Sequence, residues 1–370
     1  MNYPRGPRAR SVVSTPISTS PITWHDEARR AAFERWLADV AARRGLAPQS
    51  LRSASSDASF RRYFRIDGSA GAGGASFIVM DAPPPQEDVR PFIAVAQLLH
   101  DAGLQAPQVL EQDGAQGFLL LTDLGSRLYL NELNEARARG DTKQVDALMR
   151  SALSALVQWQ SRADASGLPP YDEALLKREL ALFPDWCVTR EFGLAWNDAQ
   201  QQQWNAACDL LVRSALAQPT VAVHRDFMPR NLMVTEPGPG ILDFQDAVRG
   251  PISYDVASML RDAFISWDEE QEIDWAVRYW EAARQAGLPV AADFGEFWRQ
   301  LEWMGLQRHL KVLGIFCRLK HRDGKAGYSA DLPRFFRYAR RVASRYQGFG
   351  PLLRLLDQVE GTQPLVGYTF

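Results

Sequence analysis

Apolar residues recur at helical spacing in the first ordered stretch of the chain, at Phe33, Trp36, Leu37, Val40 and Ala41. This spacing predicts a helix that begins after Thr23, a suitable N-cap, and ends at Gly45. Residues 50–66 and 75–85 have the β-branched and aromatic content of strands, and they flank the glycine-rich turn 68–74. The pattern therefore predicts a helix followed by an antiparallel hairpin.

A second helix and a second pair of strands follow. Pro91 opens a run of apolar residues at helical spacing, which Gly103 closes. Segment 109–125 holds two further apolar strands, joined by an Asp-Gly turn. We expect residues 23–125 to form one lobe, built mainly from antiparallel sheet and helix.

Long amphipathic helices replace this pattern from about residue 128, as in 145–156 and 204–216. One stretch, 220–250, interrupts the helices with short apolar triplets between polar loops. The triplets are 221–223, 232–234 and 240–242. We therefore expect 126–370 to form a mostly helical second lobe that contains a small cluster of strands.

Composition narrows the classes of function. The 370 residues include 42 Lys and Arg against 44 Asp and Glu, a formal net charge of −2, which argues against a nucleic-acid partner. With 46% hydrophobic residues, disorder over most of the chain is excluded. The three cysteines lie far apart without zinc-like spacing, so we expect neither a disulfide framework nor a structural zinc.

The N-terminal segment and the lengths of the apolar stretches indicate where in the cell the protein is located. Residues 1–22 hold arginine, proline and serine but no unbroken apolar stretch, so we expect a disordered tail, with an address segment or a phosphate-binding arm as the alternative. No segment reaches the ~18 uninterrupted apolar residues of a membrane span. We expect a cytoplasmic monomer with no membrane partner.

The strongest chemical signal is a short motif in the interrupted stretch. His224, Arg225 and Asp226 are followed five residues later by Asn231, which reproduces the HRDxxxxN catalytic loop of kinases. Asp243 ends an apolar strand seventeen residues after Asp226, where a kinase places its metal-binding aspartate. Phosphoryl transfer needs a carboxylate that orients the attacking hydroxyl, and Mg²⁺ prefers oxygen ligands. We predict that Asp226 is the base and that Asn231 and Asp243 hold Mg²⁺.

Each of these residues alone is more typical of a turn or of a satisfied core position. Their joint occurrence in the correct order favours phosphoryl transfer. With this motif in place, the chain resembles the aminoglycoside phosphotransferase family of kinase-like small-molecule kinases over most of residues 26–345. The segments that carry the resemblance are 55–66, 79–85, 119–125, 223–234, 240–264 and 310–325.

The resemblance implies an α+β, protein-kinase-like two-lobe fold, with an N-lobe of antiparallel sheet plus helices and a mostly helical C-lobe. It also implies ATP as co-substrate and Mg²⁺ as cofactor. Within the family the chain looks most like the bacterial kinases that phosphorylate N-acetylmuramate and N-acetylglucosamine at C1 for cell-wall recycling. The expected partner is therefore a small amino sugar.

The resemblance also assigns residues by position. Thr122, Asp123 and Leu124 resemble the hinge that hydrogen-bonds adenine. Ser55, Ser56 and Ser59 fall in the loop that the family folds over the phosphates, although without glycines a surface turn is an equal alternative. His224, Arg225 and Asp255 are expected to support the catalytic loop.

Substrate contacts are predicted in the helical lobe, where polar side chains suited to a sugar gather. The predicted substrate-binding residues are Asp246, Arg249, Arg261, Asp262 and Arg318. A solvated charged helix face is the competing interpretation for each of them.

One departure from the kinase pattern concerns the phosphates. Kinases place a phosphate-pairing lysine on the third strand, but FIVMD places Met80 or a neighbour there, and no lysine occurs between Met1 and Asp141. The usual lysine–glutamate pair, for which Glu87 would be the glutamate, cannot form. Loop amides or one of the arginines could contact the phosphates instead. The candidate arginines are Arg61, Arg62 and Arg65.

Two alternative functions stay open from the sequence. One is another small-molecule kinase that acts on an aminoglycoside or a choline-like substrate, although the mixed charges of the helical lobe favour a neutral or anionic sugar. The other is a pseudokinase that binds nucleotide without turnover, which the missing lysine favours and the intact Asp226 opposes.

Overall fold

The computed structural model describes residues 22–24, 26–56, 60–69 and 75–361. Nearly all of the predicted tail 1–22, and Ser59 of the predicted phosphate loop, lie outside these residues. The described chain divides into two compact units. The first contains the residues up to Ile93 together with Pro107–Asp123, and the second contains Ala94–Ala106 and the residues from Leu124 onward.

The first unit is built on an antiparallel sheet of five strands in the order β1-β2-β3-β5-β4. The strands are β1 (Leu46–Ser56), β2 (Arg62–Gly68), β3 (Ser76–Asp81), β4 (Val109–Asp113) and β5 (Phe118–Thr122). The predicted hairpin is present as β2 and β3, and β4 and β5 form the second predicted pair. The single strand predicted over 50–66 is wrong, because the chain leaves β1 at Ser56 and begins β2 at Arg62, after small polar residues that favour a turn.

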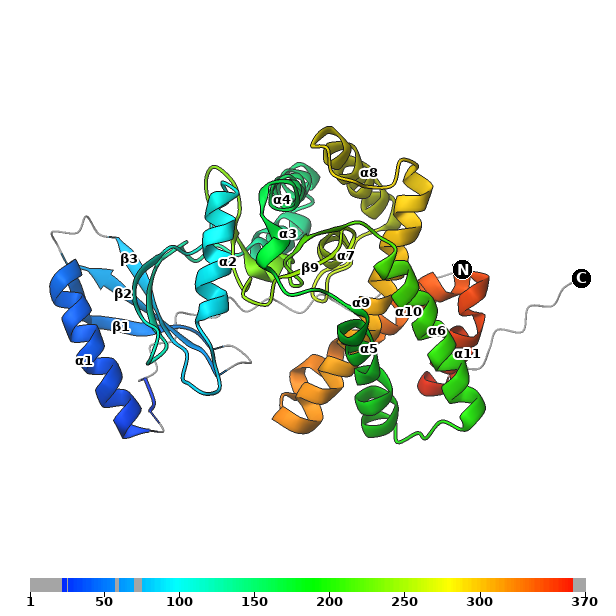
Figure 1. Ribbon diagram of the computed structural model, residues 1–370, viewed down its shortest axis with the longest axis horizontal. Helices are drawn as coiled ribbons and strands as arrows, with labels where there is room; N and C mark the ends of the chain where they lie inside the picture. Colours follow the sequence, from blue (N-terminus) through cyan, green and yellow to red (C-terminus); the bar gives the residue numbers. More distant parts are fainter. Residues whose placement is uncertain (1–21, 25, 57–59, 70–74, 362–370) are drawn as a thin grey trace, which may run out of the picture. The chain divides into compact units, whose positions relative to one another are not determined.

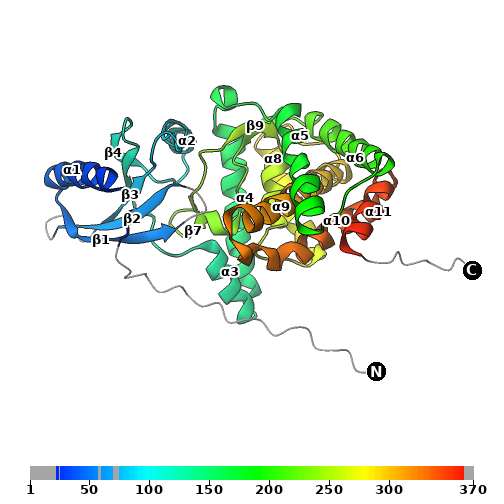
Figure 2. The ribbon, with the colours of Figure 1, turned by 90° about the horizontal axis from the view of Figure 1, so that it is seen from below.

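Helix α1 (Glu27–Arg44) lies across one face of this sheet (Figure 2). Asp26, not Thr23 as predicted, is its N-cap, since the Asp26 carboxylate accepts a hydrogen bond from the amide of Arg29 at 3.1 Å and faces the positive helix end. Gly45 ends the helix with a φ of 64°, as predicted. The core between helix and sheet contains Phe33, Leu37, Val40, Phe64, Ile66, Val79, Phe118 and Leu120.

Helix α2 (Arg90–Asp101) is the second predicted helix. The second unit adds nine described helices. They are α3 (Tyr129–Ala138), α4 (Thr142–Arg162), α5 (Glu173–Leu182), α6 (Asp198–Leu216), α7 (Tyr254–Leu260), α8 (Glu269–Gln285), α9 (Phe294–Asp323), α10 (Leu332–Arg345) and α11 (Gly350–Glu360). Shorter turns of π- or 3₁₀-helix are η2 (Ala165–Gly167), η3 (Phe183–Glu191), η4 (Pro229–Asn231), η5 (Ala326–Asp331) and η6 (Gln347–Phe349).

The 30-residue helix α9 packs against α5, α6, α7, α8 and α10 (Figure 1). Gly314 permits its close approach to the end of α5, because a Cβ at this position would lie 2.3 Å from the carbonyl carbon of Leu182. Side chains of α9 therefore reach several neighbouring helices at once.

Four short strands interrupt the helices of the second unit. β6 (Thr220–Val223) pairs with β9 (Val248–Pro251), and β7 (Leu232–Met233) pairs with β8 (Gly240–Ile241). β6, β7 and β8 fall on the three predicted triplets. β9 was not predicted, since its glycine and proline hide the strand pattern.

Candidate active site

The motif residues lie in the loop that follows β6. β6 ends at Val223, the HRD residues come next, and η4 carries the chain to Asn231 just before β7. Asp243 follows β8, which is paired with β7. The pairing of β7 with β8 therefore brings Asn231 and Asp243 close to each other.

Asp226, Asn231 and Asp243 are close in space. The Nδ2 of Asn231 donates to the backbone oxygen of Asp226 at 3.0 Å and to Oδ2 of Asp243 at 3.4 Å. Two non-glycine residues of this region have left-handed backbone, Arg225 with a φ of 74° and Asp243 with a φ of 61°. Such conformations are costly and persist where the surroundings fix them, as at many active sites.

The carboxylate of Asp226 is half-buried. Within the described residues, no side chain or backbone group donates a hydrogen bond to it, whereas its amide donates to Nδ1 of His224 at 3.3 Å. Its oxygens are thus available to accept a hydrogen bond from a substrate hydroxyl. This is the chemical position that a base for phosphoryl transfer needs.

The metal prediction rests on oxygen donors. Among the described residues, no group of three or more histidine, cysteine, aspartate or glutamate side chains could hold a metal ion by itself. A kinase Mg²⁺ needs fewer, because it takes further oxygens from water and the triphosphate. The amide oxygen of Asn231 and the carboxylate of Asp243 are hard donors of the kind that fit Mg²⁺.

Asp255, at the start of α7, contacts the backbone of the loop. Its carboxylate accepts hydrogen bonds from the amide of His224 at 2.7 Å and from the amide of Arg225 at 2.9 Å. Complete burial raises the pKa of Asp255 to about 7, although the two amide donors favour the charged form. These contacts are those that the predicted bracing role requires.

His224 joins the two ends of the site. Its Nε2 lies 3.1 Å from the backbone oxygen of Leu242, next to Asp243, and its Nδ1 accepts from the amide of Asp226. Burial lowers the pKa of His224 to about 4, so the ring is neutral at pH 7 and Nε2 carries the proton that Leu242 accepts. The ring therefore acts as a spacer between the loop and β8.

Arg225 is held by residues that sequence reasoning missed. Its Nη2 donates to Glu179 of α5 at 2.6 Å, and Lys311 of α9 donates to the same carboxylate oxygen at 2.8 Å. Tyr171 and Gln307 also donate to Glu179. Burial opposes ionisation of Glu179, but Lys311 and Arg225 outweigh it and lower the pKa to about 2. In the sequence, the only sign of this contact is that Glu179 and Lys311 are charged residues at positions that the apolar patterns of α5 and α9 place in the core.

The residues predicted to bind nucleotide are only partly described. Ser55 and Ser56 end β1, where Ser55 pairs with Tyr63 of β2. The amide and hydroxyl of Thr122 both bond to the backbone of Gln108. The side chain of Asp123 accepts from Arg65 and from Ser76 at 2.7 Å, which ties it to the sheet. Leu124, the last predicted hinge residue, lies in the second unit against Gly240.

Three of the five predicted substrate residues are accessible. Asp246 and Arg249 are exposed, and Arg318 of α9 is half-buried. No described carboxylate lies within ion-pair distance of Arg318, and its buried Nε has no hydrogen-bond partner among the described residues. Burial and the nearby Arg322 lower the pKa of Arg318.

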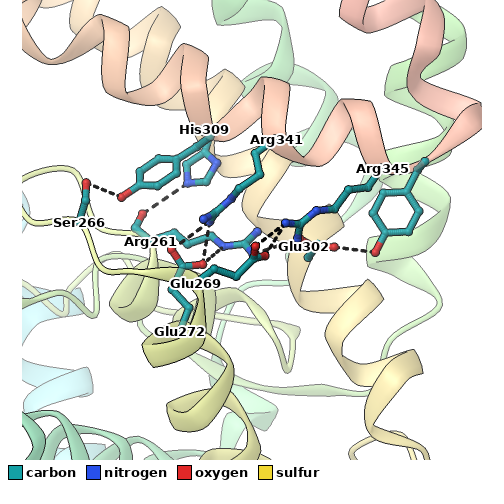
Figure 3. A network of polar contacts seen from close by, with 10 residues as sticks. Arg261, Ser266, Glu269, Glu272, Glu302, His309, Arg341 and Arg345 are labelled. Carbon is teal, nitrogen blue, oxygen red and sulfur yellow. Dashed lines mark hydrogen bonds and ion pairs between the residues drawn. The ribbon is translucent and has the colours of Figure 1, made fainter. Parts of the chain in front are cut away.

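Arg261 and Asp262 occupy a different place from the predicted one. Both are completely buried, and Arg261 is held by Glu272 at 3.0 Å and Glu302 at 3.1 Å (Figure 3). Asp262 accepts from the amide of Phe264 at 2.8 Å. Arg261 therefore joins α8 and α9, whereas Asp262 holds the turn that follows α7, and neither side chain is exposed to solvent.

None of the described helices is both long and apolar enough to span a membrane.

Comparisons with known proteins identify the family of this chain. Residues 50–294 match the model of the phosphotransferase enzyme family. A Pseudomonas aeruginosa protein named N-acetylmuramate/N-acetylglucosamine kinase is 52% identical over 309 residues, covering 84% of this chain and 88% of that protein. A Neisseria meningitidis protein of the same name is 46% identical over 343 residues, covering 92% of this chain and 99% of that protein.

A solved structure extends the comparison to the fold. The ADP-bound aminoglycoside phosphotransferase APH(2'')-Ib matches with a TM-score of 0.55 at 14% identity, over 83% of this chain and 98% of that one. At this identity the match concerns the fold alone. It confirms the predicted kinase-like α+β architecture.

Proposed function

Because this chain belongs to the phosphotransferase enzyme family, we propose that it transfers the γ-phosphoryl group of ATP to the C1 hydroxyl of N-acetylmuramate, N-acetylglucosamine or both. The observation that carries the proposal is the grouping of Asp226, Asn231 and Asp243 in a chain about half identical to two kinases named for these sugars. The choice of C1 follows from the resemblance to anomeric sugar kinases, and cell-wall recycling in the cytoplasm would be the setting.

In the proposed step, the loop after β6 supplies the base. The carboxylate of Asp226 accepts a hydrogen bond from the sugar hydroxyl and takes its proton as the oxygen bonds to the γ-phosphorus, while the bond to ADP breaks. Asn231 and Asp243 would hold Mg²⁺, which neutralises charge on the phosphates. Asp255, His224 and Arg225 keep the loop in place.

A substrate panel tests this function. We would measure ATP consumption with Mg²⁺ and N-acetylmuramate, N-acetylglucosamine, glucose, kanamycin or choline, and read the phosphorylated position by ³¹P-coupled NMR. Turnover confined to the N-acetyl sugars, with phosphate on C1, is the expected result. Turnover of kanamycin or choline instead would contradict the sugar assignment, and nucleotide binding without any turnover would identify a pseudokinase.

Arg318 is the substrate residue that the structure supports most. N-acetylmuramate carries a lactyl carboxylate that N-acetylglucosamine lacks, and a half-buried arginine without a described carboxylate partner suits an anion. Arg318→Met should raise KM for N-acetylmuramate by about tenfold and leave KM for N-acetylglucosamine nearly unchanged. Arg322→Met, on the same helix but paired with Asp323, is the matched control. Equal effects on both sugars would remove Arg318 from carboxylate recognition.

A further inference from the structure

The segment between β8 and β9 begins with Asp243 and then makes a tight turn. The amide of Ala247 donates to the backbone oxygen of Phe244 at 3.0 Å, which closes the turn over residues 244–247. Phe244 is completely buried, so its side chain anchors the turn in the core of the second unit. Gln245 occupies the first central position of this turn.

A contact from the catalytic loop supports the same turn. The Nη1 of Arg225 donates to the backbone oxygen of Asp246 at 3.4 Å. Arg225 is itself held by Glu179 at 2.6 Å. The backbone that carries Gln245 is therefore fixed by its own hydrogen bond and by an ion-paired arginine. A side chain on a fixed backbone can hold its neighbour in one orientation.

Gln245 contacts the carboxylate that is proposed to hold Mg²⁺. Its Nε2 donates to Oδ1 of Asp243 at 3.1 Å, which is shorter than the 3.4 Å contact from Asn231 to Oδ2. Asp243 has a left-handed backbone with a φ of 61°, a conformation that its surroundings must maintain. Each carboxylate oxygen of Asp243 thus has an amide donor, and together the two donors fix the orientation of the carboxylate.

The other end of the same amide group carries a cost. The Oε1 of Gln245 is buried and has no hydrogen-bond partner among the described residues. A buried acceptor without a donor is unfavourable. Turning the amide over would place Oε1 against Oδ1 of Asp243, and two acceptors repel each other. The carboxylate therefore selects the orientation in which Gln245 donates to it.

The sequence of the motif makes this contact possible. Kinases have glycine as the third residue of the motif that begins with the metal-binding aspartate, whereas this chain has Gln245 there. Glycine has no side chain, so the kinase motif offers no group for this hydrogen bond. Hydrogen bonds from neighbouring side chains orient the ligands of a metal, and losing such a bond lowers metal affinity.

We propose that Gln245 positions the carboxylate of Asp243 for Mg²⁺ through this hydrogen bond. The assignment deepens the proposed function and rests on it, because it concerns the cation that would accompany the same ATP. Gln245 acts through Asp243, so it is a positioning residue. Its loss should therefore lower metal affinity, and it should lower turnover only as far as the metal site is left unfilled.

Binding of the ATP analogue AMP-PNP with and without Mn²⁺ tests the assignment without a sugar. Mn²⁺ stands in for Mg²⁺, because both cations prefer oxygen ligands. Calorimetry would give the dissociation constant of AMP-PNP in EDTA and in Mn²⁺ for the full chain, as wild type, Gln245→Met and Gln245→Asn. The ratio of the constant in EDTA to that in Mn²⁺ measures the contribution of the metal.

Gln300→Met is the matched control for this experiment. Gln300 is half-buried like Gln245, and its Nε2 also donates to a carboxylate, that of Glu296 at 3.0 Å. Its Oε1 is likewise buried without a partner among the described residues. The control variant therefore removes an equivalent amide, on α9, and should keep the ratio of the wild type.

Gln245→Met should lower the ratio by about tenfold and leave the constant in EDTA within about twofold. It should also raise the Mg²⁺ concentration that half-saturates turnover, with kcat restored at high Mg²⁺. Gln245→Asn keeps the amide on a shorter side chain and should lie between the wild type and Gln245→Met.

Equal ratios for the wild type and Gln245→Met would overturn the assignment, as would a wild type that binds AMP-PNP equally well with and without Mn²⁺. If Gln245→Met does not fold, Gln245→Leu gives the same comparison. Wild-type protein that binds AMP-PNP more tightly in Mn²⁺ but phosphorylates no sugar would contradict the proposed function alone.

Discussion

The region beneath the catalytic loop and the region between α1 and the sheet use the same device, a buried carboxylate between two cations. Beneath the loop, Glu179 accepts from Arg225 at 2.6 Å and from Lys311 at 2.8 Å. Arg225 belongs to the loop and has a left-handed backbone with a φ of 74°. The ion pairs therefore hold a strained residue next to Asp226, the proposed base.

In the sheet the carboxylate is Asp81, which is completely buried. It accepts from Nε of Arg29 and from Nε of Arg62, each at 3.0 Å. Arg29 lies in a helix and Arg62 in a strand, so neither backbone is strained. The same kind of contact thus joins α1 to β2 and β3 in one unit and holds the loop of the proposed base in the other. If Asp226 is the base, as we propose, the conformation of the residue that a buried ion pair holds decides whether that pair serves catalysis.

The largest effect should come from the loop itself. Asp226→Asn keeps the size of the side chain but removes the base, so we expect kcat to fall by about 10²- to 10⁴-fold. ATP binding and the thermal unfolding midpoint should stay close to those of the wild type, because no described group bonds to this carboxylate. Steady-state kinetics and calorimetry on one preparation measure all three. Retained turnover would remove Asp226 from the role of base.

Glu179→Gln should come next and should lower both stability and turnover. The variant leaves Arg225 and Lys311 buried without their counter-ion, which costs about 3 kcal/mol in the free energy of unfolding. Glu173→Gln, on the same helix but paired with an exposed lysine, is the control. An unchanged kcat in the folded variant would show that the Glu179 contact supports the helices only.

The same variant has a predicted pH dependence. The folded-state pKa of Glu179, about 2, lies below its ordinary value of 4.5, so its contribution to stability is fully present above pH 4.5 and is lost as pH falls toward 2. The difference in unfolding free energy between wild type and Glu179→Gln should therefore be constant from pH 5 to 7 and shrink below pH 4.5. Urea titrations at a series of pH values would measure it, and a difference that grows on acidification would contradict the assignment.

The two regions also differ in how much the sequence reveals. Asp226, Asn231 and Asp243 lie within one short stretch, so a motif with fixed spacing finds them. Glu179 and Lys311 come from helices far apart in the sequence, and no local spacing connects them to the loop. Tertiary packing decides such contacts, and it also decides the burial of Arg261, which a charged sequence pattern cannot show.

The helices and strands also divide into those that the local sequence predicts and those that depend on distant contacts. Most helices and strands follow from local periodicity, capping and turn residues, which act within a few positions of the chain. The N-cap of α1 was misplaced because Thr23 and Asp26 are both good caps, and the contact with the Arg29 amide selects Asp26. β9 was missed because its glycine and proline hide the strand pattern, so that only its pairing with β6 makes it a strand.

Asp81→Asn should have a smaller effect than Glu179→Gln, and on stability alone. The variant removes the negative charge that pairs with Arg29 and Arg62. Because 32% of the Arg62 side chain is exposed, water can solvate its unpaired guanidinium group. We expect a loss of about 2 kcal/mol in the free energy of unfolding, measured by urea titration, with kcat of the folded enzyme unchanged. A matching fall in kcat would show that the sheet pair also positions the chemistry.

Glu111→Gln should have the smallest effect and gives the baseline for the other two carboxylates. Glu111 also lies between two arginines, Arg43 and Arg44 at 2.6 Å each, but half of Arg43 and 44% of Arg44 are exposed. Solvent screens such pairs, so we expect a loss below about 1 kcal/mol that disappears at high salt, whereas the losses at Glu179 and Asp81 persist there. Unfolding midpoints of the three variants in low and high salt measure this. If all three lose the same amount and respond alike to salt, burial does not separate these ion pairs, and strain at Arg225 alone distinguishes the catalytic region from the sheet.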